Sequence, residues 1–369
     1  MRHRIRSLKY AAPFLIYALA LLSFHERGWV IPLPLMAIWM LVPLWELMMR
    51  PDPQNLAAAE EEMARHDRTY DIWLYLVAPM QYVALWHFLD AVQEPGLQGW
   101  ELAGRIFVMG LLCGAFGINV AHELGHRHGR FERTLSRLLL LTSLYMHFYI
   151  EHNRGHHKRV STPEDPASAR YGETVYAFYL RSVRDSWRSA WRIAASDMRK
   201  AGLPVLHPRN EMLQYQLLQA AFLSILLLSF GPLPTACFLA AATLGFLMLE
   251  TVNYIEHYGL QRKPTGKGAY ERPQPHHSWN SSHVVGRLLL FELSRHSDHH
   301  YQASRKYQVL RHHDGAPQMP TGYPGMMILS LMPPLWFRVM DPRIGRQDDP
   351  SLRAEAEAEA AQRMPSAPK

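Results

Sequence analysis

The chain has 369 residues, of which 48% are hydrophobic, and it carries a formal net charge of +7. Its mean hydropathy of −0.17 averages two apolar stretches (11–121 and 214–255) with two polar stretches (122–213 and 256–369) that are rich in charge and histidine. This division is typical of a membrane protein with a solvated part. The basic residues flank apolar runs, which argues against nucleic-acid binding.

Six apolar stretches are long enough to cross a bilayer as helices. They are roughly Tyr10–Phe24, Trp29–Met49, Ile72–Leu89, Leu102–Ala121, Leu213–Phe230 and Leu233–Tyr254. No small-residue cleavage site follows the first, so we expect a span and not a removable signal peptide. Basic residues gather before the first span, between the second and third, and after the fourth, whereas the intervening loops carry only Arg27. The positive-inside rule therefore predicts that both termini and the polar regions are cytoplasmic.

A seventh apolar segment, at residues 135–150, lies between two clusters of histidine. A single crossing would put these clusters on opposite sides of the membrane, and its 16 residues cannot cross twice. We therefore expect a re-entrant or interfacial segment. Further along, Tyr176–Lys200 sets aromatic and aliphatic residues among arginines, which favours an amphipathic helix on the cytoplasmic surface. An ordinary helix of the solvated part is the alternative.

The predicted fold is all-α, an integral membrane protein with six transmembrane helices and a histidine-rich cytoplasmic cap. It is divided into four transmembrane helices (1–121), a cytoplasmic part with two histidine clusters (122–212), a transmembrane hairpin (213–255), a second cytoplasmic part (256–347) and a tail (348–369). The tail is low in complexity, and we expect it to be disordered or a solvated helix.

The histidines form four groups just outside the predicted spans: HELGH (122–126), EHNRGHH (151–157), NYIEHYG (253–259) and RHSDHH (295–300). They contain nine of the 21 histidines: His122, His126, His152, His156, His157, His257, His296, His299 and His300. Nine imidazoles are too many for one ion and suit two ions with four or five ligands each. Two spans separate the second group from the third, so the chain returns to the same side and the groups can meet.

The spacing within each group predicts which rings share an ion. His122 and His126 are four residues apart and lie on one face of a helix. His152 and His156 have the same spacing, whereas His157 points about 100° further round, toward a neighbouring site. The last group repeats the pattern, with spacings of three and four residues.

Ligand chemistry narrows the choice of metal. Imidazole suits zinc, copper, iron and nickel. Cys113 and Cys237 lie in apolar stretches, which leaves no thiolate for a structural zinc or an iron–sulfur cluster. Two ions held by nitrogen at a lipid boundary favour redox chemistry on O2, with iron as the best candidate. Several polar residues beside the histidines are expected to form hydrogen bonds with the rings, with plain salt bridges or helix caps as an equal alternative: Glu123, Asn253, Glu256, Arg295 and Asp298.

Other functions fit parts of this pattern. HELGH alone matches zinc metalloproteases, with Glu123 as the general base, but that interpretation leaves seven histidines unexplained. A desaturase, a fatty-acid hydroxylase or a methyl-aromatic hydroxylase would use the same metals on another substrate. A metal carrier or sensor would bind the ions without catalysis.

The motifs HELGHR, EHNRGHH, NYIEHYGL and RHSDHH resemble the signatures of membrane alkane 1-monooxygenases, and HSWNSSH and PTGYPGM resemble the segments around the last of them. The resemblance runs from about Thr69 to Arg343, and HYG points to the alkane and xylene branch of the membrane desaturase and hydroxylase superfamily. It implies a six-helix membrane fold, a di-iron centre with the nine histidines as ligands, and a bacterial inner-membrane location. The chain departs from the family's pattern at Arg127, where lysine is usual, and at Trp45-Glu46.

The resemblance also implies the reaction: O2 and two electrons convert the terminal methyl group of an n-alkane to a primary alcohol. Acid–base residues cannot break such a C–H bond, so the metal must carry the chemistry. Rubredoxin, with rubredoxin reductase, is the implied electron donor. The chain has no dinucleotide-binding fingerprint and too few cysteines for a fused rubredoxin. We therefore expect a separate, acidic donor that docks on the basic cytoplasmic face.

Overall fold

The computed structural model describes residues 6–266 and 268–347, and most of them are helical. The predicted tail at 348–369 lies outside the described residues. Within the described residues, six helices are long and apolar enough to cross a membrane: Leu8–His25, Gly28–Met48, Thr69–Ala91, Gly99–Gly125, Glu211–Phe230 and Pro232–His257. The all-α fold with six spans is thereby confirmed.

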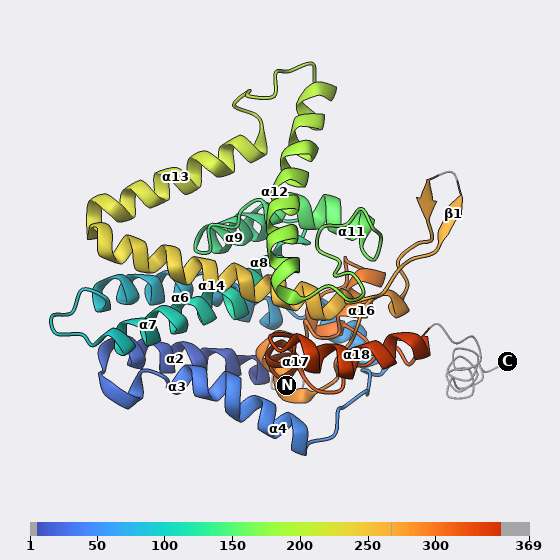
Figure 1. Ribbon diagram of the computed structural model, residues 1–369, viewed down its shortest axis with the longest axis horizontal. Helices are drawn as coiled ribbons and strands as arrows, with labels where there is room; N and C mark the ends of the chain where they lie inside the picture. The colour runs from blue at the N-terminus through green and yellow to red at the C-terminus, as the bar shows by residue number, and fades with distance from the viewer. Residues whose placement is uncertain (1–5, 267, 348–369) are drawn as a thin grey trace.

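Several spans are built from consecutive helical elements, which lie side by side across the left half of Figure 1. In chain order they are η1 (Leu8–Ala11) with α2 (Ala12–His25); η2 (Gly28–Val30), α3 (Leu33–Met36), η3 (Ala37–Leu41) and α4 (Val42–Met48); α6 (Thr69–Ala91); α7 (Gly99–Leu111), η4 (Leu112–Ile118) and α8 (Asn119–Gly125); α13 (Glu211–Phe230); and α14 (Pro232–His257). Both η3 and η4 are π-helical, a form that is common at functional sites.

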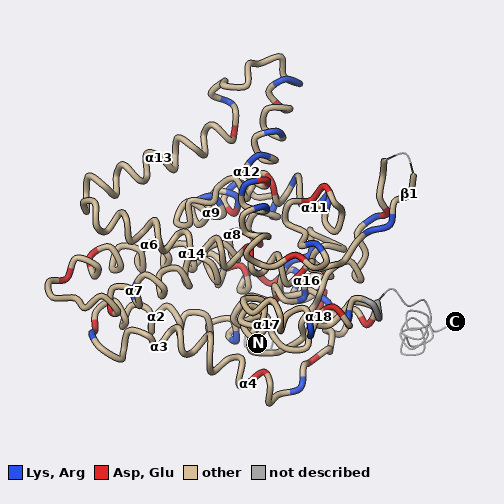
Figure 2. The backbone as a smooth tube through the Cα atoms, in the orientation of Figure 1, with Lys and Arg blue, Asp and Glu red and all other residues tan. Residues whose placement is uncertain are grey.

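The remaining elements form a cap at one end of the bundle. They are α5 (Ala58–His66), α9 (Arg130–Leu141), α10 (Phe148–Glu151), the π-helical η5 (His152–His156), α11 (His157–Arg159), α12 (Val175–Lys200), η6 (Pro275–His277), α15 (Val284–Leu289), α16 (His296–Tyr301), η7 (Tyr307–Val309), α17 (Tyr323–Ser330), α18 (Pro333–Gln347) and an antiparallel hairpin of β1 (Pro264–Gly266) and β2 (Ala269–Tyr270). Most charged residues lie in this part and along α12, while the spans are nearly free of charge (Figure 2).

The apolar segment at 135–150 does not continue as one helix. Helix α9 ends at Leu141, the chain turns through Leu144 at a positive φ of 51°, and α10 begins at Phe148. Two hydrogen bonds hold the turn against the last two spans: Tyr145 Oη donates to Glu250 over 2.8 Å, and the Met146 amide donates to Gln219 over 3.0 Å. The segment therefore packs beside the spans, and its re-entrant character stays a prediction.

Glu46 ties the end of the second span to the cap. Its side chain is only 2% exposed, and it accepts a 2.8 Å hydrogen bond from the backbone amide of Gly286. Its carboxylate also fills the space that a Cβ on Gly286 or Gly322 would need. Glycine at both positions therefore lets the cap approach this carboxylate closely.

Arg105 joins the spans at the opposite end of the bundle. Its guanidinium is fully buried and donates to the backbone carbonyls of Ser23, Ala91 and Glu26 at 3.3, 2.7 and 2.8 Å. These carbonyls lie at the C-terminal ends of α2 and α6, where helices leave acceptors unsatisfied. One cation therefore holds the ends of the first, third and fourth spans together.

Candidate metal centre

The nine predicted histidines converge at the junction between the bundle and the cap. Their ligand nitrogens form two groups, and within each group all of them lie within 4.8 Å of one another. The five-membered group contains His122, His126, His152, His157 and His299, and the four-membered group contains His156, His257, His296 and His300. Helix α8 contributes His122, and His126 follows directly as its C-cap residue; both belong to one group, as their four-residue spacing predicts.

The second histidine cluster departs from the predicted pairing. His152 Nε2 lies 2.9 Å from His157 Nε2 in the five-membered group, whereas His156 belongs to the other group. The pairing of His152 with His156 was therefore wrong. These residues start in the π-helix η5, where each turn holds more residues than in an α-helix, so side chains five apart come to lie on one face.

The last cluster follows α-helical spacing. In α16, His296 and His300 are four residues apart and share the four-membered group, while His299 turns toward the five-membered group. His257 ends the last span, and its Nε2 lies 3.2 Å from that of His296. The two spans of the α13–α14 hairpin thus return the chain to the cap, as expected.

Hydrogen bonding alone cannot account for the five-membered group. Four Nε2–Nε2 contacts of 2.9–3.1 Å link its members in a chain. Each Nε2 carries either a proton or one lone pair, so five such atoms can form at most two N–H···N bonds. A cation shared by the lone pairs would satisfy all five. Two nitrogens bound at right angles to an ion at roughly 2.1 Å would lie about 3 Å apart, as these do.

The surroundings favour the form of imidazole that binds metal. Burial lowers the pKa of His152, His299 and His300 well below the ordinary value, and the neighbouring imidazoles lower it further. These rings are therefore neutral at physiological pH, and neutral imidazole is the form that ligates metal ions. The geometry and the protonation state both fit a metal site.

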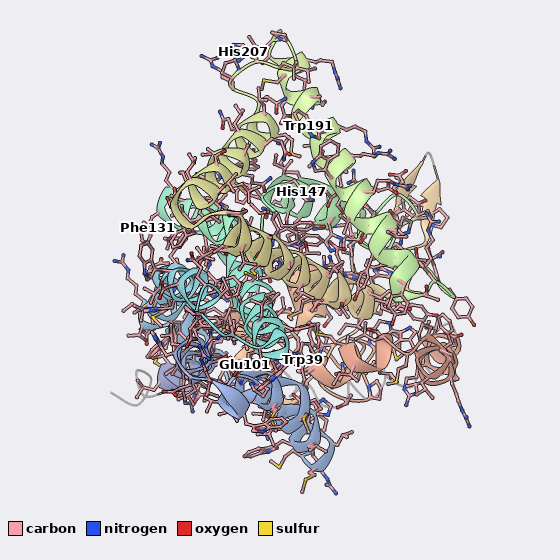
Figure 3. All side chains as sticks on the ribbon, turned by 60° about the vertical axis from the view of Figure 1, so that its left-hand side comes forward. Trp39, Glu101, Phe131, His147, Trp191 and His207 are labelled. Carbon is pink, nitrogen blue, oxygen red and sulfur yellow. The ribbon has the colours of Figure 1, made fainter. Side chains whose placement is uncertain are left out.

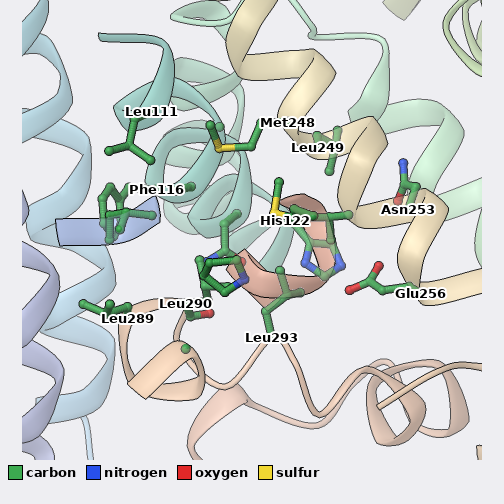
Figure 4. A pocket seen from close by; sticks show the side chains of 18 of the residues that line it. Leu111, Phe116, His122, Met248, Leu249, Asn253, Glu256, Leu289, Leu290 and Leu293 are labelled. Carbon is green, nitrogen blue, oxygen red and sulfur yellow. The ribbon is translucent and has the colours of Figure 1, made fainter. Parts of the chain in front are cut away.

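An apolar cavity runs from the interior of the bundle to both histidine groups; it has about 800 Å³ of space not filled by atoms, a figure that includes open solvent. His122 and His152 of one group and His296 of the other line it. The view in Figure 4 has His122 near Glu256 and Asn253, with Leu111 further away among apolar side chains. The spans contribute apolar residues to the wall, including residues of the π-helices η3 and η4: Trp39, Phe116, Met248 and Leu249.

Comparisons with known proteins agree with this architecture. Residues 98–329 match the family model described as fatty acid desaturase. Alkane 1-monooxygenase 2 of Pseudomonas aeruginosa is 42% identical over 82% of this chain and 81% of its own length. Alkane 1-monooxygenase of Pseudomonas putida is 39% identical over 87% of this chain and 80% of its own. The chain belongs to the alkane 1-monooxygenase family.

A more distant relative widens this comparison. The xylene/toluene monooxygenase hydroxylase component XylM of Pseudomonas putida is 30% identical over 73% of this chain and 72% of its own length. This member of the alkane monooxygenase family is thus a multi-pass membrane protein whose histidine clusters can form a metal site.

Asp165 is a functional candidate in this alkane monooxygenase homologue that sequence reasoning missed. Its Oδ2 lies 2.8 Å from His156 Nδ1 and accepts a 2.6 Å hydrogen bond from Ser168. Burial alone would lower the pKa of His156, but the Asp165 carboxylate outweighs it and raises that pKa. In the sequence, a carboxylate in the loop after a histidine cluster indicates such a partner only weakly. The neighbouring Glu164 occupies the same loop, yet it is exposed.

Two of the polar residues expected beside the histidines lie at the cavity. Glu256 Oε2 is 3.1 Å from His296 Nε2, and its other oxygen accepts a 2.7 Å hydrogen bond from Tyr323. Asn253 lines the same cavity. Both side chains therefore lie where the apolar cavity meets the imidazoles.

The other three have different partners. Glu123 accepts hydrogen bonds from Arg127 at 2.5 Å and from a backbone amide. Asp298 forms an ion pair with Arg305 at 2.8 Å, and Arg295 donates to backbone carbonyls of neighbouring loops. Glu123 and Asp298 therefore form the salt bridges that the sequence left as an alternative, whereas the contacts of Arg295 with loop carbonyls were not predicted.

A third cluster, Glu271, His276 and His277, does not fit a metal. The Nδ1 atom of His277 accepts a hydrogen bond from the Gln274 amide at 2.9 Å, so its neutral ring carries the proton on Nε2. That nitrogen lies 3.1 Å from Glu271 and can donate to it. Both nitrogens of His277 are thus engaged in hydrogen bonds, which leaves neither of them free to bind an ion.

Proposed function

We propose that this chain hydroxylates the terminal methyl group of an n-alkane to a primary alcohol, using O2, two electrons from rubredoxin and two non-haem irons held by the nine histidines. The observation that carries the proposal is the apolar cavity, because it reaches imidazoles of both groups. The names of the relatives, alkane 1-monooxygenases, support the same substrate class.

Iron would supply the redox chemistry with O2 that no side chain can perform on an unactivated C–H bond. The division of the histidines into five and four supports two ions. The protein's own part is to bind and orient the substrate. Each methylene that is transferred from water into the cavity contributes about 0.8 kcal/mol, and His122, His152 and His296 mark the end where the methyl group must stop. The apolar walls also exclude water from that end.

The electron donor would approach from the side away from the cavity. Among the nine histidines, only His126 and His157 are partly exposed. Arg130, Arg154 and Lys158 lie close to them in sequence and are exposed, which favours an acidic protein such as rubredoxin, itself reduced by rubredoxin reductase. The same basic residues support an inner-membrane orientation with the centre and both termini in the cytoplasm.

Of two alternative functions, one is supported by an observation and the other is opposed by one. A methyl-aromatic substrate is favoured by the relationship to XylM, and xylene supplied to the same assay would reveal it. A zinc protease is disfavoured, because His122 and His126 belong to a group of five imidazoles and Glu123 is paired with Arg127. A catalytic zinc has three protein ligands and leaves its general base free to act.

The test supplies n-alkanes, from octane up to hexadecane in length, to the purified protein together with rubredoxin, its reductase and NADH. We expect primary alcohols and two irons per chain. The His257→Ala variant should lose iron and make no alcohol. His207→Ala is the matched control, because His207 lies at the far tip of the loop after α12 (Figure 3) and should leave both unchanged. One zinc per chain with no alkane-dependent O2 consumption would refute the proposal.

A further inference from the structure

A second, polar chamber lies beside the metal centre. It is small, with room for about one water molecule, and His152 and His156, one from each metal group, line it. Phe148, His152 and Asn253 line both this chamber and the apolar cavity, so these three residues form a shared wall. The centre therefore has an apolar compartment on one side of this wall and a polar one on the other.

Glu250 contributes a buried carboxyl group to the chamber. It is 2% exposed and accepts hydrogen bonds from Tyr145 at 2.8 Å and Ser182 at 2.6 Å, with Asn253 at 3.5 Å. Among the described residues, these hydrogen-bond partners are all neutral. A buried carboxylate without a cationic partner is costly, so this group is poised to take up a proton.

His147 points to an ordered water molecule in the chamber. Its ring lies in the interior of the molecule (Figure 3), lines the chamber and is only 4% exposed. Its Nε2 has no partner among the described residues. Buried polar atoms are almost always satisfied, and a polar chamber with several donors and acceptors is the kind of site where ordered water satisfies them.

The chamber is close to the aqueous surface. Glu151 lines it and accepts a hydrogen bond from Arg159, which also donates to Ser189 at 2.7 Å. Arg159 and Ser189 line two polar surface pockets that adjoin α12. Ser186 lies one helical turn from Ser189 and faces the chamber. Glu151, through Arg159, therefore connects the lining of the chamber to these surface pockets.

The proposed reaction needs such a connection. Hydroxylation breaks the O–O bond, inserts one oxygen into the C–H bond and releases the other as water, which takes up two protons and the two electrons from the donor protein. The apolar cavity cannot deliver protons. We infer that the chamber, with Glu250 as its proton-carrying carboxyl, supplies the two protons that each turnover consumes. This inference rests on the proposed function.

The test is Glu250→Gln in the rubredoxin-coupled assay, because glutamine keeps the shape and hydrogen-bonding capacity of the side chain but cannot carry a proton. We expect wild-type iron content and alkane binding. Alcohol formation should fall roughly 10-fold or more. The solvent deuterium isotope effect should rise, and more O2 should be lost as hydrogen peroxide. Glu250→Asp, which restores a carboxyl, should recover part of the rate.

A matched pair of tyrosine variants distinguishes a loss of proton supply from structural damage. Tyr145→Phe removes one hydrogen bond to Glu250 and should slow turnover with a raised isotope effect. Tyr179→Phe removes a similar hydrogen bond, to Thr251, outside the chamber and should behave as wild type. If Glu250→Gln loses its iron, Tyr145→Phe decides, and an unchanged rate and isotope effect in that variant overturns the inference. Wild-type kinetics in iron-loaded Glu250→Gln overturns it too, whereas an inactive wild-type protein would refute the proposed function itself.

Discussion

Asp165 is the buried carboxylate that orients His156, and its loss should weaken metal binding more than it disturbs the fold. In Asp165→Asn, the amide is a poorer acceptor for His156 Nδ1, so iron affinity should fall about 10- to 100-fold. Iron retention during titration with a chelator measures this change. Glu164→Gln, at the exposed neighbouring position, is the control and should retain iron as the wild type does. Equal retention by both variants would contradict the assigned role.

Glu292 should make stability depend on pH. It binds Arg287 at 2.7 Å and Tyr10 at 2.7 Å. Burial would raise its pKa, but Arg287, Lys9 and Arg295 outweigh burial and hold the pKa at about 2, against an ordinary value of 4.5. Because the folded-state pKa is depressed, its stabilisation, on the order of 3 kcal/mol, is present above pH 4.5 and is lost as the pH falls toward 2.

The measurement for Glu292 is thermal unfolding of the wild type and Glu292→Gln in detergent across this pH range. The variant should have the lower Tm at pH 6, and the gap should close as the pH falls from about 4.5. A gap that stays constant with pH would show that the charge of Glu292 contributes nothing.

At the scale of elements, the fourth span should limit substrate length. Leu111 ends α7, is 1% exposed and lies far from His122 along the cavity (Figure 4). Leu111→Phe should shorten the preferred alkane and Leu111→Ala should lengthen it, since one methylene in an apolar pocket changes discrimination by about 1–3 kcal/mol. Competition among octane, dodecane and hexadecane measures the shift. Leu228→Ala, on an exposed face of α13, should leave the preference unchanged.

Local spacing explains which parts of the site the sequence could predict. Hydropathy located all six spans, and α-helical periodicity paired His122 with His126 correctly. The same periodicity paired His152 with the wrong histidine, because the five-residue π-helix at this point is too short to leave a periodic signal in the sequence. Asp165 was missed because only burial distinguishes it from Glu164.

At the scale of the whole molecule, the proposed orientation can be tested directly. Green fluorescent protein fused to the C-terminus should fluoresce, because it folds in the cytoplasm. Alkaline phosphatase inserted after Gly96, in the loop before α7, should be active, because that loop should lie on the other side of the membrane. A dark fluorescent-protein fusion together with inactive alkaline phosphatase would show that the topology is the opposite one, and a cytoplasmic electron donor would then be ruled out.

Convergence of the four histidine groups on one side followed from counting spans, but the contacts that fix the cap did not. Glu46 and Gly286 are 240 residues apart, and no local pattern in the sequence connects them. The departure from the family's pattern at Trp45-Glu46 drew attention to Glu46, but it did not indicate that Gly286 is the residue that Glu46 binds.

The bond from Glu46 to Gly286 also implies an order of assembly. A membrane chain is inserted from its N-terminus as the ribosome makes it, so this carboxyl group reaches its place before the amide that it binds has been synthesised. The first two spans, which include Trp39, are therefore inserted before the final third of the chain, which contains Gly286, has been synthesised and can pack against them. A chain shortened at its start would lose a membrane span, the Trp39 wall of the apolar cavity and the hydrogen bond that joins the second span to α15 in a single step.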